Sequence, residues 1–154
     1  GDVASYLNPE TADKGKKFPR VNPAHGPEED GCVEFPARGK PEKSGSPYLL
    51  EFEFDVPEEG YYGLFVRADV PSPAGAHDSF FYGFDDQPMI PGSFAEARSG
   101  RKRWYMVAQS GPQETRSACH LTRGRHKLRI SPRESSRIGL IAVTDNHYAF
   151  ELRE

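Results

Sequence analysis

The stretch YLLEFEFDVPEEGYYGLFVRADV, residues 48–70, decides the fold class of this chain. Apolar and polar residues alternate through its first part, YLLEFEFDV, with the period of a strand that has one buried face. PEEG, residues 57–60, then opens with proline and closes with glycine, as tight turns often do. The second part, GYYGLFVRADV, alternates again and predicts the return strand of a hairpin. The predicted core-facing side chains are Leu50, Phe52, Phe54, Val56, Tyr62, Leu64, Val66 and Ala68.

Further strand signals recur through the rest of the chain, separated by turn signals about every 8–12 residues. No segment shows a convincing helical pattern. We therefore predict an all-β protein, an antiparallel β-sandwich of jelly-roll type with eight or nine strands. The whole chain, 1–154, is expected to be a single domain, with an irregular N-terminal segment over 1–30 and the sandwich core over 31–146. The other predicted strands are residues 3–7, 32–36, 78–85, 103–109, 115–121, 125–131 and 137–145.

Composition and charge argue against several classes of partner. The 154 residues carry 20 basic and 23 acidic side chains, a formal net charge of −3, which gives no electrostatic reason to bind nucleic acid or an anionic membrane. No apolar run approaches the roughly 18 residues needed to span a bilayer. The chain opens with GDVASYL, without an apolar signal segment. Either the protein is cytoplasmic, or its signal peptide and neighbouring domains lie outside this sequence. A first residue Gly1 without methionine suggests a piece excised from a longer protein.

Cysteines and histidines do not form a recognisable catalytic or zinc pattern. Cys32 and Cys119 allow one disulfide, or equally two buried thiols. His126 lies on the apolar face of its predicted strand and is interpreted as a core histidine, whereas His77, beside Asp78, is the histidine best placed for a site. The sequence contains no GxSxG or HExxH motif and no phosphate-binding glycine loop. We therefore predict that the protein is not an enzyme.

Three motifs in a fixed order resemble a known group of proteins. VPEEGYYGLFVR resembles a valine–proline, glycine–tyrosine strand that ends in arginine. DSFFYGFDD resembles an aspartate–serine–phenylalanine strand, and LTRGRHKLRI followed by RE and IGLIAVTD resembles the last two strands of the same group. This group is the galactose-binding-like jelly-roll carbohydrate-binding modules, with relatives of the family 6, 16 and 35 types. The resemblance covers about residues 32–146.

The resemblance implies a non-catalytic module of a larger, secreted, bacterial polysaccharide-degrading enzyme. Its partners would be a polysaccharide or oligosaccharide and the catalytic domain of the parent enzyme. The family often holds a structural calcium with the help of a Glu-Ala-Glu strand near the N-terminus. SYLNPETAD lacks that triplet, but Glu10, Asp13 and Asp145 offer the hard oxygen ligands that calcium prefers.

A sugar-binding surface needs an aromatic ring for the apolar face of a pyranose and planar polar groups for its hydroxyls. Trp104 begins a strand after the basic loop SGRKR and is either a ligand platform or a core residue that closes one end of the sandwich. The neighbouring basic side chains favour an acidic or sulfated glycan, unless they form only a solvated loop. Arg67 and Asp78 are expected either to contact ligand or to pair with each other, and Arg133 and Glu134 to pair before the last strand. The candidate ligand-binding residues are Trp104, Tyr105, Arg101, Arg103, Phe81, Arg67, Asp78 and Asp85.

The motif DSFFYGFDD contains three of these candidates, Asp78, Phe81 and Asp85. Alternation places Phe80, Tyr82 and Phe84 in the core and Phe81 on the opposite face. Gly83 lacks a side chain on the Phe81 face, which predicts free space beside that ring for a neighbour or a sugar.

Two other functions compete with sugar binding at this point. A structural jelly-roll domain would pack on a catalytic domain without binding sugar. A small enzyme with a cupin-like or lyase-like barrel would need a metal-binding histidine pair on one strand, which the sequence lacks.

Overall fold

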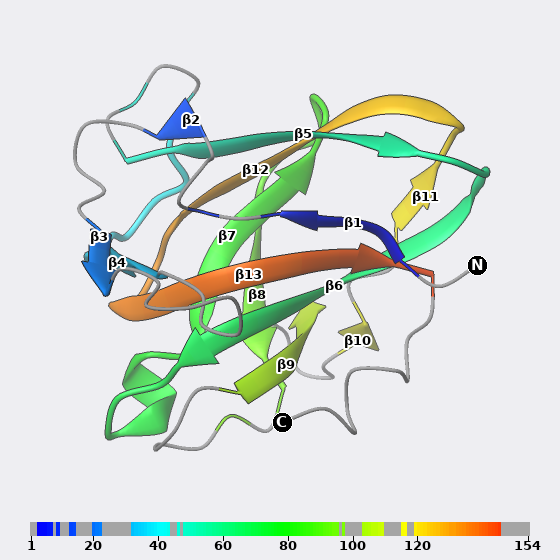
Figure 1. Cartoon of the computed structure of the whole chain (residues 1–154). Coiled ribbons are helices and arrows are strands. Elements are labelled where there is room, and N and C mark those ends of the chain that lie inside the picture. Colours follow the sequence, from blue (N-terminus) through cyan, green and yellow to red (C-terminus); the bar gives the residue numbers. More distant parts are fainter. Residues whose placement is uncertain are drawn as a thin grey trace.

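The computed structural model has the predicted architecture, a β-sandwich made almost entirely of antiparallel strands (Figure 1). It describes residues 3–7, 9, 13–14, 20–22, 32–43, 46, 48–95, 97, 103–109, 115–116 and 119–145. Within these ranges the only helical element is the short 3₁₀ turn η1 (Ala74–Ala76), and no described helix is long or apolar enough to cross a membrane. The strands are β1 (Val3–Leu7), β2 (Asp13–Lys14), β3 (Arg20–Asn22), β4 (Cys32–Phe35), β5 (Leu50–Val56), β6 (Gly60–Asp69), β7 (Ser79–Phe84), β8 (Ile90–Phe94), β9 (Arg103–Gln109), β10 (Thr115–Arg116), β11 (Cys119–Leu121), β12 (Gly124–Pro132) and β13 (Ser136–Thr144).

Two sheets face each other across the core. In the first sheet the order is β3-β4-β13-β6-β9, with β1 also paired to β13 and β11 also paired to β6. The second sheet has the order β2-β5-β12-β7-β8-β9, and β10 is added on β9. Strand β9 belongs to both sheets, because residues 103–106 pair with β6 and residues 107–109 pair with β8. This shared strand closes the sandwich along one side.

The alternation predicted for the central hairpin is confirmed. All eight core-facing residues predicted for β5 and β6 are buried, and they pack in one cluster with the inward residues of β7, β12 and β13. Phe80 lies at the centre of this cluster and contacts the rings of Phe35, Tyr82 and Phe94 at centroid distances of 6.4, 6.3 and 5.3 Å. On β5, Glu51, Glu53 and Asp55 point to the outside, as the period of two requires.

Three features of the strand pattern differ from the prediction. Strand β8 is not among the predicted strands, and its sequence IPGSF contains proline and glycine, which are typical of turns. Gly92 is needed there, since an added Cβ would lie 2.7 Å from Val107 Cγ1 and 2.8 Å from Tyr82 Cε1. The predicted strand 115–121 is divided into β10 and β11, which pair with different strands. The segment 1–30 contains the two short strands β2 and β3 besides β1.

Candidate functional site

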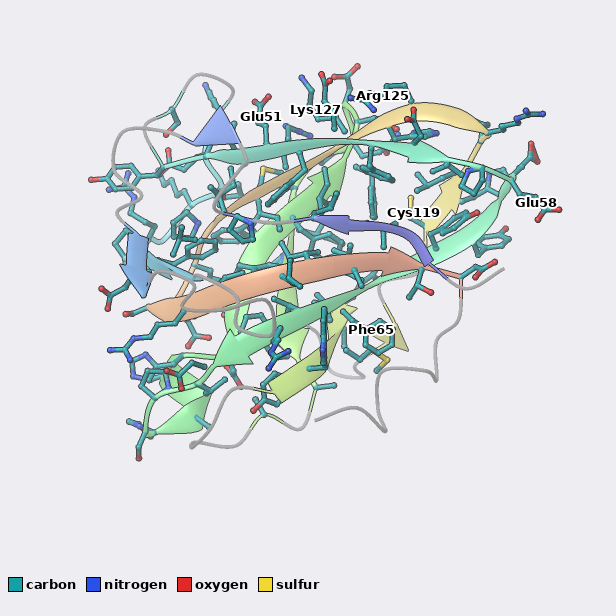
Figure 2. All side chains as sticks on the ribbon, in the orientation of Figure 1. Glu51, Glu58, Phe65, Cys119, Arg125 and Lys127 are labelled. Carbon is teal, nitrogen blue, oxygen red and sulfur yellow. The ribbon has the colours of Figure 1, made fainter. Side chains whose placement is uncertain are left out.

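The first sheet carries an aromatic cluster on its outer face, the side turned away from the second sheet. Trp104 and Met106 project from β9 onto this face and pack against Phe65 of β6 and Ala142 of β13. Phe65 is only 1% exposed, whereas Trp104 stays half-buried and keeps part of its surface open. Figure 2 shows Phe65 on the side of β6 that faces away from β5. Trp104 therefore rests on a firm apolar base outside the main core.

Arg67 stands directly beside this tryptophan. The two residues are cross-strand partners in the β6–β9 register, and both side chains are half-buried. Two residues further along β6, Asp69 pairs with Arg137 of β13, with Nη1 and Oδ2 3.3 Å apart. The outer face thus combines an aromatic ring with two arginines and a carboxylate, the group types that sugar recognition requires. We call Trp104, Arg67, Asp69 and Arg137 the tryptophan face.

A network of polar side chains joins the loops at the nearby end of the sandwich. Arg133 Nη1 donates to Ser79 Oγ at 2.8 Å and lies 3.6 Å from the carboxylate of Glu134. The Ser79 hydroxyl donates to the same carboxylate. His77 Nδ1 lies 2.5 Å from the carbonyl oxygen of Ser135, which ties the β6–β7 loop to the β12–β13 loop. The predicted pairing of Arg133 with Glu134 is confirmed, and it fixes the loop before β13.

The β4–β5 connection lies at the same end and encloses an open hollow of about 650 Å³. Arg38 donates to the Glu42 carboxylate at 2.9 Å and sits 4.1 Å from the centroid of the Tyr48 ring. The Ser46 hydroxyl donates to the second oxygen of the same carboxylate at 2.8 Å. Lys40 and Lys43, both exposed, also line the hollow. The lining therefore has an excess of positive charge, because its one acid is already paired.

Two aromatic candidates do not lie on the accessible surface. Tyr105 faces the core, is 6% exposed and stacks on Phe94 with ring centroids 6.1 Å apart. Phe81 is on the outer face of the second sheet as predicted, but it is also only 6% exposed. The space expected beside it is filled, since a Cβ on Gly83 would lie 3.1 Å from the Gln87 carbonyl oxygen and 3.3 Å from Met89 Cγ. The prediction that Phe81 reaches solvent is therefore wrong.

Asp85 uses both carboxylate oxygens inside the protein. Oδ1 accepts from the backbone N–H of Lys127 at 2.9 Å, and Oδ2 lies 2.7 Å from Nδ1 of His126. The backbone of Asp85 has φ of 53°, a left-handed conformation that aspartate tolerates better than most residues. These contacts hold the turn after β7 against β12, and a ligand contact by Asp85 stays a prediction.

His126 is the satisfied core histidine that the sequence predicted. Its Nε2 lies 2.7 Å from the Thr122 carbonyl oxygen, so both ring nitrogens meet acceptors. Burial alone would lower the pKa of His126, but the hydrogen bonds to Asp85 and Thr122 and the charge of Asp85 together raise it. The charged imidazolium is therefore favoured at this position.

The remaining candidates are partly outside the described residues. Arg101 falls outside them, and for Arg103 the backbone alone is described, opposite Ala68 in the β6–β9 register. Asp78 is half-buried at the start of β7, and its carbonyl oxygen accepts from Phe94 N at 2.7 Å. Of the eight predicted ligand contacts, the described structure places Trp104 and Arg67 side by side on one surface.

The structure describes two of the three calcium ligands predicted from the sequence, Asp13 and Asp145, and their backbones lie apart. Asp13 lies opposite Glu51 in the β2–β5 register, near the start of β5. Asp145 follows β13 near the start of β6, toward the other end of the sandwich (Figure 1). Among the described residues, the buried Asp145 Oδ1 has no hydrogen-bond partner, which suits one calcium ligand. Glu10 lies outside the described residues, and among those that are described no three acids, histidines or cysteines cluster around a common point. A structural calcium stays a prediction that depends on Asp145.

Cys119 is a free thiol in β11, so it does not form the disulfide with Cys32 that the sequence allowed. Burial, and then the charge of Asp85, raise the pKa of its thiol. A raised pKa keeps the thiol protonated and poorly nucleophilic.

The sequence reasoning missed part of the tryptophan face. Phe65 and Met106 form its base, and Asp69 with Arg137 forms its polar border. A signal for Phe65 was present, because it stands at an outward position of β6 among polar residues. An apolar residue at such a position marks a surface that something covers.

Comparison with known proteins extends the resemblance at the level of the fold. No family model matches the sequence, and no curated protein matches it. A family 35 carbohydrate-binding module from Clostridium thermocellum is similar in structure, with a TM-score of 0.60 and 18% identity over 91% of this chain and 98% of that module. A carbohydrate-binding module from the Cellvibrio mixtus lichenase 5A, solved with cellotriose, is similar with a TM-score of 0.59 and 12% identity over 94% of this chain and 99% of that module.

Larger enzymes also contain a similar unit. A Paenibacillus cycloisomaltooligosaccharide glucanotransferase, solved with cycloisomaltoheptaose, matches 91% of this chain with a TM-score of 0.58 and 18% identity, but this chain spans only 18% of that enzyme. The chain thus has the jelly-roll fold of carbohydrate-binding modules and matches such modules over nearly their whole length.

Proposed function

We propose that this chain is a non-catalytic carbohydrate-binding module that holds a larger, secreted polysaccharide-degrading enzyme on its glycan. The observation that carries the proposal is the position of Trp104 beside Arg67 on the outer face of the first sheet. The indole offers an apolar ring for the C–H face of a pyranose, and the guanidinium offers paired donors for adjacent hydroxyls or a carboxylate.

The fold supports this proposal in a second way. Two modules with this fold are named carbohydrate-binding modules, and one of them was solved with cellotriose. This chain covers nearly the whole length of both.

The glycan in this proposal is acidic or sulfated. Arg67 and Arg137 lie on the tryptophan face, and Arg38, Lys40 and Lys43 line the hollow of the β4–β5 loop. A carboxylate or sulfate gains charge-assisted hydrogen bonds from such groups, and dissolved salt weakens them. A neutral glycan would depend mainly on Trp104 and would show little response to salt.

Affinity gel electrophoresis tests the proposal directly. The protein is run through gels that contain hydroxyethylcellulose, β-1,3-galactan, mannan, dextran, polygalacturonate or carrageenan, each at low and high salt. We expect the wild-type protein to be retained on at least one of the two acidic polymers, and to be retained less at high salt. At the same salt concentration, Trp104→Ala should be retained less than the wild type. A Trp104→Phe variant is the matched control, because it keeps an aromatic ring at the same position.

Two results would contradict the proposal. Free migration of the wild-type protein in every gel would favour a structural jelly-roll domain that only packs on a neighbouring domain. Retention on a neutral polymer alone, unchanged by salt, would keep sugar binding but exclude the acidic glycan. Circular dichroism of Trp104→Ala shows whether any loss of retention reflects a lost fold.

A further inference from the structure

The end of the sandwich opposite the β4–β5 hollow carries an exposed aromatic residue that the proposed site does not use. Tyr61 is 65% exposed, and it is the large hydrophobic side chain that stands out as exposed among the described residues. It lies at the start of β6, where β5 turns into β6 and β11 runs alongside, at the right of Figure 1. Glu58 in the same turn and Cys119 at the start of β11 mark this end in Figure 2.

The tyrosine ring is held in place by its neighbours. His120 of β11 is its direct cross-strand partner, and the two rings meet edge to face with centroids 5.2 Å apart. The imidazole is in turn held by Glu59, whose Oε2 lies 3.3 Å from His120 Nε2. A ring fixed in this way loses less conformational freedom when a ligand stacks on it than a free side chain would.

Polar groups surround the ring on the same surface. The side chains of Glu59 and His120 are 62% and 46% exposed, so their polar atoms remain open to solvent beside the ring. A pyranose stacked on Tyr61 would find a carboxylate acceptor and an imidazole within reach of its hydroxyls. Isolated exposed hydrophobic residues are common on protein surfaces. Here, however, the aromatic ring contacts the imidazole, and the imidazole contacts the carboxylate.

This patch is separate from the tryptophan face. Tyr61 and Arg67 both point outward from β6 and are six residues apart, which corresponds to about 20 Å along the strand. Trp104 is the cross-strand partner of Arg67, so it lies equally far from Tyr61. One sugar unit is too short to contact both the Tyr61 ring and the Trp104 ring. A single polysaccharide chain, or two chains side by side, can contact both.

We infer that Tyr61, with His120 and Glu59, forms a second glycan-contact site, so that the protein holds polysaccharide at two points. The inference rests on the proposed sugar-binding function and adds a site and a bivalent mode to it. Two weak contacts on one polymer retain it more strongly than either contact alone, because the second forms at a high effective concentration.

The test compares four proteins in the affinity gels that contain hydroxyethylcellulose, β-1,3-galactan, mannan, dextran, polygalacturonate or carrageenan: wild type, Tyr61→Ala, Trp104→Ala and the double variant. On the polymer that retains the wild type, we expect each single variant to lose about 3- to 10-fold in affinity and the double variant to lose retention completely. Tyr61→Phe should keep most of the wild-type affinity, since it keeps the ring. Glu58→Ala, in the same exposed turn but outside the site, is the matched control and should behave as wild type.

The outcomes separate this inference from the proposed function. Wild-type retention that Tyr61→Ala leaves unchanged, or that Trp104→Ala abolishes alone, would overturn the second site and leave the sugar-binding function standing. Free migration of the wild type in all gels would overturn both. Thermal melting of Tyr61→Ala should match the wild type because the side chain is exposed, so a loss of retention reports binding rather than unfolding.

Discussion

The two outer faces of this sandwich have opposite characters, although both consist of outward residues of antiparallel strands. On the second sheet, charged side chains of β5 and β12 form a row of ion pairs that stays in solvent (Figure 2). Arg125 lies 3.1 Å from Glu53 and 3.2 Å from Asp55, and Lys127 Nζ lies 3.3 Å from Glu51. On the first sheet the outward positions carry Trp104, Met106 and the buried Phe65. We call this surface the aromatic face, and the surface with the ion pairs the charged face.

The two faces differ in the free energy that each can contribute to binding a ligand. Exposed ion pairs contribute about 0–1 kcal/mol each, because water already solvates the charges well. An aromatic surface gains free energy when a ligand covers it, since apolar area leaves water. The aromatic face therefore has more free energy to offer a ligand than the charged face has.

The largest expected effect comes from removing the base of the aromatic face. Phe65→Ala should lower the free energy of unfolding by about 3–5 kcal/mol, because a ring that is almost fully buried leaves a cavity. Glu53→Ala, an outward residue of the other face, should change it by less than about 0.5 kcal/mol. Urea denaturation of both variants measures the contrast, and equal losses would show that the two faces are not as different as their burial indicates.

One ion pair of the second sheet differs from its solvated neighbours. The His126 side chain is only 10% exposed and holds Asp85, which also accepts a backbone N–H. Asp85→Asn removes the charge and should cost about 1–3 kcal/mol near pH 6, where the histidine is protonated. An effect as small as that of Glu53→Ala would place this pair with the solvated ones.

The pH dependence of the same pair has a defined sign. The pKa of His126 is higher in the folded protein than its usual value of about 6.5, so the stabilisation is fully present below about pH 6.5. It is lost as the pH rises through the folded-state pKa. As the pH increases through this range, the melting temperature of the wild type should therefore decrease. The melting temperature of His126→Gln should change less. A wild-type melting temperature that rises with pH, with this rise absent in His126→Gln, would contradict the assignment.

A smaller effect is expected for the arginine of the tryptophan face. Arg67→Gln should weaken retention on polygalacturonate or carrageenan severalfold at low salt, because one charge-assisted contact is lost. At high salt the variant and the wild type should converge, since screening has already weakened that contact. A loss of equal size at both salt concentrations would mean that Arg67 acts through the fold rather than through the ligand.

The smallest effect is expected on the charged face. Lys127→Ala removes the partner of Glu51 and should change the free energy of unfolding by less than about 1 kcal/mol, and by less still in high salt. Thermal or urea denaturation at two salt concentrations measures it. A large loss that salt does not reduce would show that the ion pairs of this face do more than keep it solvated.

Local patterning explains why the sandwich could be predicted from sequence. Alternation in residues 50–56 and 60–69 fixes both strands and their buried sides, because a strand places successive side chains on opposite faces. Strand β8 escaped prediction since Pro91 and Gly92 resemble turn residues. The reason for Gly92 is a close approach of Tyr82 and Val107, a tertiary contact that sequence does not display.

The site was harder to predict, because alternation tells which residues share a face but not what covers that face. Phe81 was expected to be accessible, yet the β4–β5 loop crosses the second sheet at Ser131, its cross-strand partner, where Glu42 N donates to Ser131 Oγ at 3.2 Å. Tyr105 and Trp104 are neighbours in sequence, and only the fold shows that Trp104 is the outward one. Arg67 joins Trp104 because β6 pairs with β9, which brings together two residues that are 37 positions apart in the chain.

The most direct test compares the loss of the tryptophan on one face with the loss of two charges on the other. Trp104→Ala and the double variant Arg125→Ala/Lys127→Ala are compared with the wild type on the same polysaccharide gel. We predict that Trp104→Ala weakens retention by about 3- to 10-fold, while the double variant of the charged face is retained as the wild type is. Loss of retention in the charged-face variant, with Trp104→Ala unaffected and both proteins folded, would contradict the claim that the aromatic face binds the glycan.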